Sequence, residues 1–467
     1  VTVSNADVVQ DPVPHCNVTG IIGREIHFEL KLPEDWNGKL LMGGGGGFVG
    51  SVQNSALVYP MLRPLQRGYA TVGTDTGHTA RGTDASWALN NMERLVNFGH
   101  AAVHRTAEVA KTITHLHYGS PSNRNYFFGC SRGGGQALMA AQRYPDDFDG
   151  IIAGAPAFNW SGIAAVGLQV ANAMFNDPAD PAKAALTPAS LELLESSILA
   201  ACDANDGLED RILNDPRQCD FDPAELPRCA GATPADDCLT SDQLAAIQVI
   251  YGGPHDSEGQ RIYQPYPFGA EATTGGWVPW LVPGEEPPTP DGPTLSYAFS
   301  TGIFAYFINQ DPDWQRSEEK FVNFAERVAL ADSILSATNP DLSAFAANGG
   351  KLLMWHGWSD AALSALGTID YYEQVVSHNP GNEDFAKLFM LPGVLHCGRG
   401  PGPNVADYLT ALENWVERDV APQSIDAHFV TAELQPDGAR PLCPYPQSAV
   451  YDGEGSDRDP DNFSCSY

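Results

Sequence analysis

The sequence predicts an α/β fold with a large insertion, on three observations. A short aromatic segment, residues 125–128, reads as a strand and leads through a glycine-flanked Ser131 into a helix-forming run. Two later strand-like segments, residues 351–357 and 388–391, each lead into a loop that carries polar side chains. An early strand-like segment, residues 39–42, runs directly into five glycines. This combination is typical of the α/β-hydrolase fold.

The early segment matters because of the glycines at 43–47 that follow it. A serine nucleophile needs N–H donors aimed at the oxyanion that develops during attack. In this fold one donor is the residue after the serine, here Arg132, and the other comes from a glycine-rich loop after an early strand. We choose Gly44 as the second donor, with Gly43 next. Five glycines could instead cradle a phosphate, but no Lys-Ser or Lys-Thr pair follows them.

The central element is the sequence Gly-Cys-Ser-Arg-Gly at 129–133. Gly-x-Ser-x-Gly on a sharp strand-to-helix turn is the nucleophile elbow, where glycines give the backbone room to turn. The motif alone is weak in a chain with 46 glycines, and the alternative is a serine in a tight packing turn. Here a strand precedes it, and a helical run over 134–144 follows until Pro145. We therefore predict Ser131 as the nucleophile.

The two later strands supply an acid and a base. Asp360 follows the strand at 351–357, and His396 follows the strand at 388–391. The order Ser131, Asp360, His396 is the one that this fold requires. His396 would accept the serine proton and later protonate the leaving group, while Asp360 would hold the imidazole in the right tautomer.

Three other residues compete for these roles. His356 also lies near a strand end, but it precedes the acid instead of following it. Asp370 and Asp384 are the alternative acids. Both lie in polar segments, where a carboxylate is more often surface charge than a catalytic group.

Each candidate catalytic residue of the serine–histidine pair has a cysteine as its direct neighbour. Cys130 precedes Ser131, and Cys397 follows His396. If the two cysteines are bonded, the bridge clamps the nucleophile segment to the histidine loop across more than half of the chain.

With these motifs the chain resembles the tannase and feruloyl esterase family, which also contains the mono(2-hydroxyethyl) terephthalate hydrolases. The likeness runs nearly end to end and is carried by the elbow and by the segments 36–39, 150–156, 356–361 and 441–446. The resemblance implies an α/β-hydrolase core with a large inserted lid, and hydrolysis of esters of aromatic acids. It also implies a disulfide between Cys130 and Cys397.

The insertion is placed where the hydrolase pattern lapses. The pattern stops after Ala155-Pro156 and resumes near residue 349, and no repeat is visible between them. We predict a catalytic core at 1–158 and 339–467, and a lid domain at 159–338. Long insertions over such a core are usually functional.

The lid contains an acidic turn at 202–212. Three aspartates around a glycine suit a hard cation with oxygen ligands, although the turn lacks the glutamate of an EF-hand. Acidic turns of this type are often only solvated. The family resemblance implies a structural Ca²⁺ ion and no organic cofactor. It assigns as ligands the side chains of Asp203, Asp206 and Asp210 and the carbonyls of Leu208 and Ile212.

Nine cysteines suggest an oxidising compartment, so we expect a secreted or periplasmic protein. No signal peptide is visible at Val1, which fits a mature or trimmed chain. In the family an early cysteine near Cys16 usually pairs with one further upstream, so Cys16 is expected to be unpaired. The spacing of the remaining cysteines suggests three local bridges, Cys202–Cys219, Cys229–Cys238 and Cys443–Cys465.

The net charge of the chain limits the classes of molecule that we expect it to bind. A formal net charge of −32 argues against nucleic acid or an anionic membrane surface, and no apolar run has membrane-spanning length. We expect a small aromatic ester as the partner, while the oligomeric state stays open. An anionic substrate would meet long-range repulsion unless a local cation offsets it.

Substrate choice should come from apolar side chains that face Ser131. Most of the aromatic residues of the lid, Tyr297, Phe304 and Tyr306 among them, could equally form its own core. As substrate-binding residues we name Trp277, Trp280, Leu295, Phe299, Trp358 and Leu363.

One position separates the branches of the family. The terephthalate-monoester hydrolases carry an arginine shortly before a Phe-Ser pair in the lid, where this chain has Leu295 before Phe299-Ser300. No arginine occurs between Arg261 and Arg316, so a substrate carboxylate would lack its bidentate partner. Feruloyl or other hydroxycinnamoyl esters are the first choice, galloyl esters the next, and terephthalate monoesters the alternative. A serine peptidase on this fold and a non-catalytic binding protein are remoter hypotheses.

Overall fold

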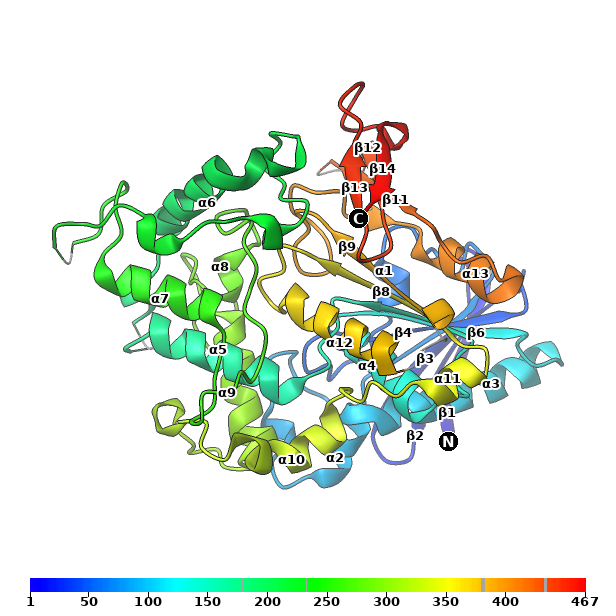
Figure 1. Ribbon diagram of the computed structural model, residues 1–467. Coiled ribbons are helices and arrows are strands. Elements are labelled where there is room, and N and C mark those ends of the chain that lie inside the picture. Colours follow the sequence, from blue (N-terminus) through cyan, green and yellow to red (C-terminus); the bar gives the residue numbers. More distant parts are fainter. Residues whose placement is uncertain (178–179, 232, 379–382, 432–434) are drawn as a thin grey trace.

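The computed structural model describes residues 1–467 except 178–179, 232, 379–382 and 432–434. Its centre is a nine-stranded sheet (Figure 1). Strands β4 to β9 pair in parallel, whereas the N-terminal strands pair antiparallel. The order across the sheet is β1 (Thr2–Val9), β2 (His15–Ile22), β3 (Ile26–Pro33), β5 (Ala70–Thr74), β4 (Lys39–Gly43), β6 (Arg124–Cys130), β7 (Gly150–Gly154), β8 (Lys351–Gly357) and β9 (Ala386–Leu391).

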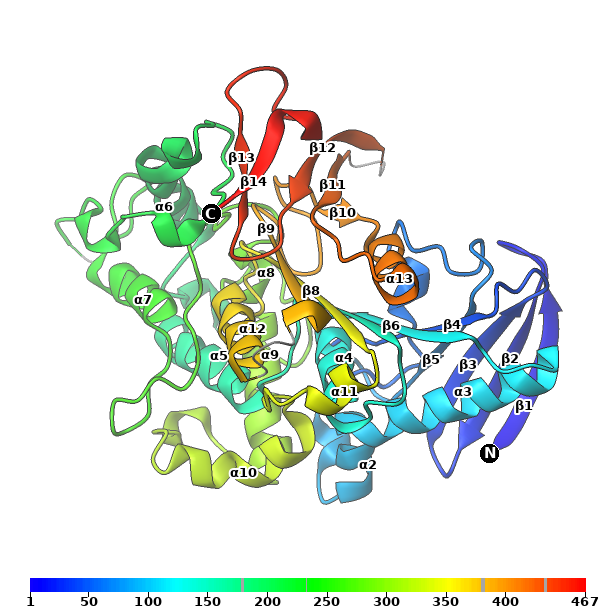
Figure 2. The same cartoon turned by 45° about the vertical axis from the view of Figure 1, so that its right-hand side comes forward.

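Helices cover both faces of this sheet, as Figure 2 shows. Consecutive residues of the buried strands point to opposite faces, so Ile151 and Leu352 pack on one side while Ile152 and Leu353 pack on the other. The first side is covered by α3 (Ala102–Tyr118), α4 (Arg132–Arg143) and α12 (Ala365–His378), and the second by α1 (Ser55–Val58) and α13 (Tyr408–Arg418).

The four predicted strands are all present as β4, β6, β8 and β9. The helix after Ser131 is α4, which begins at Arg132, two residues before the predicted run, because the turn at Ser131 leads straight into it. The antiparallel strands β1 to β3 extend the sheet beyond what the motifs predicted.

The part of the chain between β7 and β8 is mainly helical and lies beside the sheet (Figure 1). Its described residues add no strand to the central sheet, and they form most of two hydrophobic clusters, one of which also includes residues before β6 such as Phe48 and Phe98. The domain limits at residues 159 and 338 stay a prediction. The helices are α5 (Trp160–Met174), α6 (Pro188–Cys202), α7 (Ser241–Gly252), the short kinked α8 (Trp277–Trp280), α9 (Leu295–Gly302), α10 (Phe324–Leu335) and α11 (Ser343–Ala347). Outside this region, α2 (Met92–Val96) precedes α3.

Two small sheets complete the C-terminal part. One consists of β10 (Val405–Ala406), β11 (Ile425–Val430) and β12 (Pro436–Leu442), and the other of β13 (Ser448–Tyr451) and β14 (Phe463–Ser466). Among the helices that the structure describes, none has the length and apolar character to cross a membrane.

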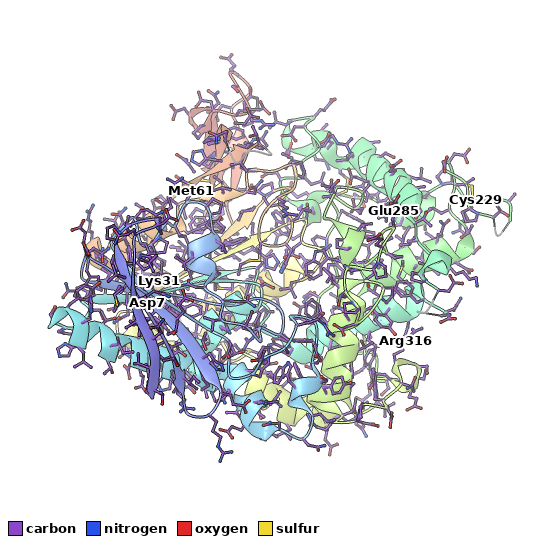
Figure 3. The ribbon with its side chains drawn as sticks, turned by 180° about the vertical axis from the view of Figure 1, so that it is seen from behind. Asp7, Lys31, Met61, Cys229, Glu285 and Arg316 are labelled. Atoms are coloured by element: carbon purple, nitrogen blue, oxygen red, sulfur yellow. A yellow bond between two sulfur atoms is a disulfide. The ribbon has the colours of Figure 1, made fainter. Side chains whose placement is uncertain are left out.

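Four disulfides join the pairs that were predicted, Cys130–Cys397, Cys202–Cys219, Cys229–Cys238 and Cys443–Cys465. The first spans 267 residues and joins β6 to the loop after β9. Cys229 lies at the outer edge of the helical region (Figure 3). Cys16, on β2, is a free cysteine in the described chain.

Candidate active site

Ser131 occupies the turn between β6 and α4 with φ 62° and ψ −125°. A positive φ is uncommon for a residue that is not glycine, and it marks a backbone held by its surroundings. The Ser131 N–H donates to the Gly154 carbonyl at 3.0 Å, and its own carbonyl accepts from the Ala157 N–H at 2.9 Å. The turn is therefore fixed against the neighbouring strand β7 and the segment after it.

The turn is possible only because small residues surround it. A Cβ on Gly129 would lie 2.2 Å from the backbone of Gly133, and a Cβ on Gly134 would lie 2.3 Å from the Gly154 carbonyl oxygen. Both contacts are with backbone, which cannot move aside without breaking the sheet edge. The glycines of the motif are thus needed for packing of α4 against the strands as well as for the turn.

His396 and Asp360 form a hydrogen-bonded pair, with His396 Nδ1 2.7 Å from Asp360 Oδ2. The other carboxylate oxygen, Oδ1, accepts the N–H groups of Ala362 and Leu363 at 2.8 and 3.0 Å. Burial alone would raise the pKa of Asp360, but the neighbouring imidazole of His396 and the hydrogen bonds to the carboxylate lower it well below its ordinary range. Asp360 is therefore an ionised acceptor that orients His396.

His356 lies on the other side of Asp360 and is completely buried. Its Nε2 is 3.0 Å from Asp360 Oδ2, and its Nδ1 is 2.8 Å from Thr368 Oγ1. With both nitrogens engaged in the protein interior, His356 supports the acid and does not line the cavity that holds Ser131. The alternative acids Asp370 and Asp384 are exposed, and neither is bonded to His396.

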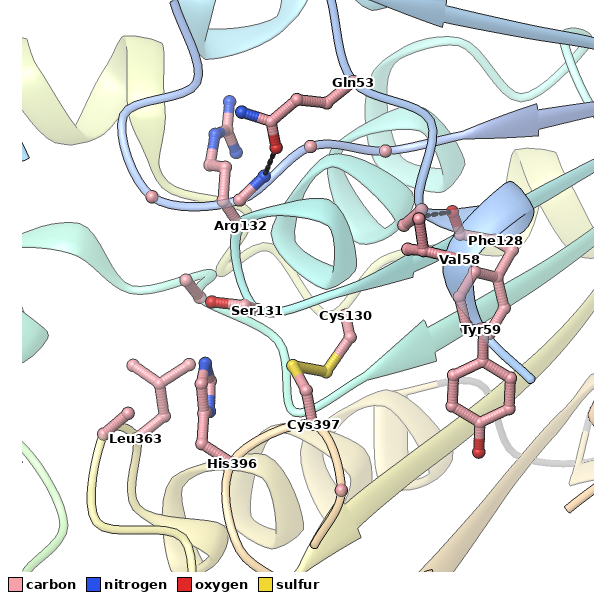
Figure 4. Close-up of a pocket in the computed structure, with 18 of the residues that line it drawn as sticks. Gln53, Val58, Tyr59, Phe128, Cys130, Ser131, Arg132, Leu363, His396 and Cys397 are labelled. Carbon is pink, nitrogen blue, oxygen red and sulfur yellow. Dashed lines mark hydrogen bonds between the residues drawn. A yellow bond between two sulfur atoms is a disulfide. The ribbon is translucent and has the colours of Figure 1, made fainter. Parts of the chain in front are cut away.

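Ser131 and His396 line one cavity of about 880 Å³. The imidazole of His396 points toward Ser131, and the Cys130–Cys397 disulfide lies directly beside the pair (Figure 4). Within the described residues no hydrogen bond joins Ser131 Oγ to the imidazole; such bonds often tighten only when substrate is bound. Trp280 packs edge-to-face on His396, with 5.0 Å between ring centroids, and restricts the ring from the lid side.

The glycine loop is bonded differently from the prediction. The Gly44 N–H donates to the Phe128 carbonyl at 2.9 Å, because Gly44 continues the pairing of β4 with β6. That N–H is therefore engaged with the sheet, and the role of Gly44 as an oxyanion donor stays a prediction. The next two N–H groups, of Gly45 and Gly46, donate to side-chain oxygens of Gln136 and Gln53 at 3.0 and 2.8 Å. The sequence interpretation missed these glutamines, which hold the loop beside α4.

Arg132 has an N–H at the first position of α4, where no intrahelical acceptor exists. Its side chain is buried, donates to the carbonyls of Phe98 and Gly99, and lies over the rings of Phe98 and Trp160. Burial lowers the pKa of Arg132 to about 9. The guanidinium therefore anchors the start of the helix, while the backbone N–H remains available at the turn.

The cavity contains three of the six predicted substrate-binding residues, Trp280, Phe299 and Leu363. The other three do not line this cavity, and their role in substrate binding stays a prediction. Trp277 is buried in the core of the helical region, Trp358 is buried in the core beside the sheet, and Leu295 lies at the start of α9, outside the cavity lining. On the same side as Phe299 the lining also includes Trp160, Ile163, Tyr266, Ser296, Ser300 and Ile303.

The carboxylates of the acidic turn after α6 are bonded to the turn itself and to Arg440. Asp203 and Asp206 accept backbone N–H groups of the turn, and Asp210 Oδ2 pairs with Arg440 at 2.6 Å. Burial, followed by the negative charge of Asp210, raises the pKa of Asp206 to about 6. The carboxylate oxygens of these aspartates are ligands of the type that Ca²⁺ prefers.

However, no three His, Cys, Asp or Glu side chains in the described part of the chain are grouped as a metal would require. Leu208 and Ile212 meet these carboxylates through their N–H groups, which donate to Asp206 and Asp210. The residue types fit a calcium site, whereas the arrangement has the carboxylates bonded to the turn and to Arg440. The calcium site therefore stays a prediction.

Comparison with known proteins gives one consistent result. Residues 10–466 match the family model described as tannase and feruloyl esterase. Over 98% of its length the chain is 37% identical to an uncharacterised esterase of Xanthomonas campestris, of which it covers 85%. Over 97% it is 34% identical to the mono(2-hydroxyethyl) terephthalate hydrolase of Piscinibacter sakaiensis, of which it covers 84%.

The fold has the same relatives. The structure matches the crystal structure of feruloyl esterase B from Aspergillus oryzae with a TM-score of 0.85 and 26% sequence identity. The match covers 100% of this chain and 96% of that one. The predicted α/β-hydrolase fold is confirmed.

Proposed function

The chain belongs to the tannase and feruloyl esterase family, and from this premise we propose that it hydrolyses esters of aromatic acids through Ser131, His396 and Asp360. Members of this family are carboxylic ester hydrolases, and the substrate is a small ester. The observation that carries the proposal is the cavity in which a serine on a nucleophile turn faces a histidine oriented by a buried aspartate.

The reaction follows from these positions. His396 Nε2 removes the proton of Ser131 as its Oγ attacks the ester carbonyl, and Asp360 stabilises the imidazolium that forms. Collapse of the tetrahedral intermediate breaks the bond to the alcohol, which leaves with the proton from His396. Water then attacks the acyl-enzyme with His396 again as base, releasing the aromatic acid and restoring Ser131.

The oxyanion would be stabilised by the Arg132 N–H together with one N–H of the Gly45–Gly46 pair. Gly44 stays the alternative donor; its N–H is bonded to a backbone carbonyl of the sheet, whereas those of Gly45 and Gly46 are bonded to side chains. A glutamine oxygen accepts each of the two loop N–H groups. Binding of an oxyanion would therefore exchange one neutral acceptor for a charged one, which forms the stronger hydrogen bond.

The part of the cavity lined by residues of the helical region best fits an aromatic acyl group that carries no charge. The lining there consists of aromatic, aliphatic and hydroxyl side chains, among them Trp280, Phe299 and Ser300, and Leu363 faces them. Because Leu295 offers no cation, a terephthalate carboxylate would lack an ionic partner. Hydroxycinnamoyl esters are the first candidates and galloyl esters the next, whereas the relative in Piscinibacter sakaiensis keeps terephthalate monoesters as the alternative.

The test is turnover of four esters by the wild type and by Ser131→Ala: methyl ferulate, methyl gallate, mono(2-hydroxyethyl) terephthalate and a p-nitrophenyl acyl ester. We expect ferulate or gallate to have the highest kcat/KM, and the variant to be folded and inactive. Highest activity on the terephthalate monoester would overturn the substrate assignment. Substantial activity of Ser131→Ala would overturn the nucleophile.

Two further proposals concern the compartment of the enzyme and a bound ion. Four disulfides support secretion into an oxidising compartment, because thiols stay reduced in the cytosol. The turn at Asp203, Asp206 and Asp210 is proposed to bind Ca²⁺ as a structural ion, on the support of its carboxylate oxygen donors.

A further inference from the structure

One carboxylate oxygen of Asp360 serves two imidazoles. Asp360 Oδ2 lies 2.7 Å from His396 Nδ1 and 3.0 Å from His356 Nε2, whereas Oδ1 accepts two backbone N–H groups. Of the two histidines, His396 lines the cavity with Ser131 and His356 does not. The second imidazole, His356, takes no part in the proton transfers of hydrolysis.

The contacts of His356 determine which ring nitrogen carries the hydrogen. Nε2 lies close to two acceptors, the Asp360 carboxylate and the Leu363 carbonyl at 3.2 Å, so the hydrogen is on this nitrogen. Nδ1 lies 2.8 Å from Thr368 Oγ1, and in a neutral imidazole this nitrogen is then an acceptor. The Thr368 hydroxyl therefore donates to Nδ1, and His356 donates to Asp360.

This short series of hydrogen bonds lies in the protein interior. His356 and Thr368 are completely buried, and Asp360 is 2% exposed. Strand β8 supplies His356 and helix α12 supplies Thr368, so packing of the helix on the sheet brings the hydroxyl to the ring. Hydrogen bonds in such surroundings are electrostatically stronger than in water, and an unpaired partner is costly.

The donor on Asp360 reduces the attraction of this carboxylate for the His396 proton. Burial raises the pKa of Asp360, whereas the charge of His396 and then the hydrogen bond from His356 lower it well below its ordinary range. Asp360 stabilises the imidazolium that forms when His396 accepts the serine proton. A second hydrogen on the same oxygen disperses its negative charge, so the imidazolium gains less from it.

We propose that His356 and Thr368 are positioning residues that act on His396 through Asp360 and extend hydrolysis to lower pH. The inference rests on the proposed function, since it takes His396 as the base. Without the His356 donor, Asp360 would hold the His396 proton more strongly. The base would then be protonated at a higher pH, and the rate would fall earlier as the pH decreases.

Other ionisable groups surround Asp360 and the cavity. Tyr263 and Tyr266 interact with the Asp360 charge, but burial raises the pKa of both well above the ordinary value, so they stay neutral in acid. Asp370, on α12, acts on Tyr263 in the same direction. The charged side chains that line the cavity together with His396 are Glu29, Lys31, Arg132 and Arg399, and they are the same in every variant compared below.

The test is the pH profile of kcat/KM on methyl ferulate, whose acid limb reports protonation of the base in the free enzyme. His356→Leu removes the donor to Asp360 and should move this limb up by about 0.5–1 pH unit, the effect of one hydrogen bond. Thr368→Val removes the donor to His356 and should move the limb in the same direction by less. Thr368→Ser keeps the hydroxyl and should keep the wild-type limb.

The matched control is Thr114→Val, on α3. Thr114 is also completely buried, but its hydroxyl has no hydrogen-bond partner among the described residues, so the limb should not move. A purely structural role would lower kcat or the unfolding free energy without displacing the limb.

An acid limb that stays in place in folded His356→Leu and Thr368→Val, or that moves to lower pH, would overturn the proposal. If His356→Leu does not fold, the comparison of Thr368→Val with Thr368→Ser decides alone. A wild type without an acid limb would instead refute His396 as the base, and with it the proposed function.

Discussion

The Cys130–Cys397 disulfide gives the sharpest quantitative prediction, because it joins residues 267 apart and borders both Ser131 and His396. The perturbation is the double variant Cys130→Ala/Cys397→Ala. The matched control is Cys229→Ala/Cys238→Ala, which removes a bridge spanning only 9 residues at the outer edge of the helical region.

The magnitude follows from loop-closure entropy. A loop of 267 residues gives about 5–6 kcal/mol at 25 °C, and a loop of 9 residues about 2.5 kcal/mol, from the chain-entropy relation for cross-links. Urea unfolding should therefore show a loss of unfolding free energy that is about 3 kcal/mol larger for the first variant than for the second. Both variants remove two sulfur atoms and leave two alanine methyl groups, so the chemical change is the same and the loop length differs.

The same variants test the positioning of the histidine. Cys397 follows His396 directly, and a displacement of about 1 Å in a catalytic group costs on the order of 100-fold in rate. We expect kcat on methyl ferulate to fall about 100-fold for Cys130→Ala/Cys397→Ala and to stay unchanged for the control. Equal stability losses would refute the entropy argument, and an unchanged kcat in the folded first variant would refute the clamp.

Three other predictions concern ionisable groups. Asp360→Asn should lower kcat about 10⁴-fold, because asparagine no longer holds His396 in the correct tautomer; a loss below about 10-fold, measured by steady-state kinetics, would contradict this role. Burial raises the pKa of Glu271 from 4.5 to about 7, so its protonated form stabilises the fold fully below about pH 4.5, and this stability is lost as the pH rises through 7. Glu271 should contribute up to about 3 kcal/mol to the difference in urea unfolding free energy between pH 5 and pH 8, and Glu271→Gln should reduce the difference by that contribution; an unaltered pH dependence would exclude Glu271 as a source. Ca²⁺ should raise the Tm of chelator-treated enzyme in a concentration-dependent way, and Asp206→Asn should abolish the effect, whereas a constant Tm would speak against the calcium proposal.

Much of the site was predictable because its elements are local. The nucleophile turn requires small residues within four positions of Ser131, and these are visible as glycines in the sequence. Asp360 and His396 each follow a strand by a few residues, and parallel strands deliver their ends to the same edge of the sheet. Chain order and strand ends therefore sufficed to bring these three residues into one prediction.

The hydrogen bonding of the glycine loop could not be predicted because it depends on pairing between distant segments. Gly44 is an ordinary loop glycine in the sequence, but the pairing of β4 with β6 continues to it and uses its N–H for the Phe128 carbonyl. How far a ladder extends is set by two strands together and cannot be judged from one. The role of Gln136 is hidden for the same reason, since its side chain reaches the glycine loop across 91 residues.

For helix α9, the sequence does not show which face of the helix lines the cavity. Ser296, Phe299, Ser300 and Ile303 follow the i, i+3, i+4, i+7 spacing of one helix face and line the active-site cavity, while Tyr297 lies on the opposite face beside another cavity. Both faces carry an aromatic side chain, so the periodicity gives the two faces without identifying the one that meets Ser131.

Contact with α5 determines which face of α9 lines the cavity that holds Ser131. A Cβ on Gly167 would lie 2.0 Å from Ser300 Oγ, so α9 approaches α5 closely at this glycine and is fixed in its rotation. The choice between Phe299 and Tyr297 as a pocket residue is thus made by helix packing. Gly167, a glycine in the interior of α5, is the feature of the sequence from which such a contact could be inferred.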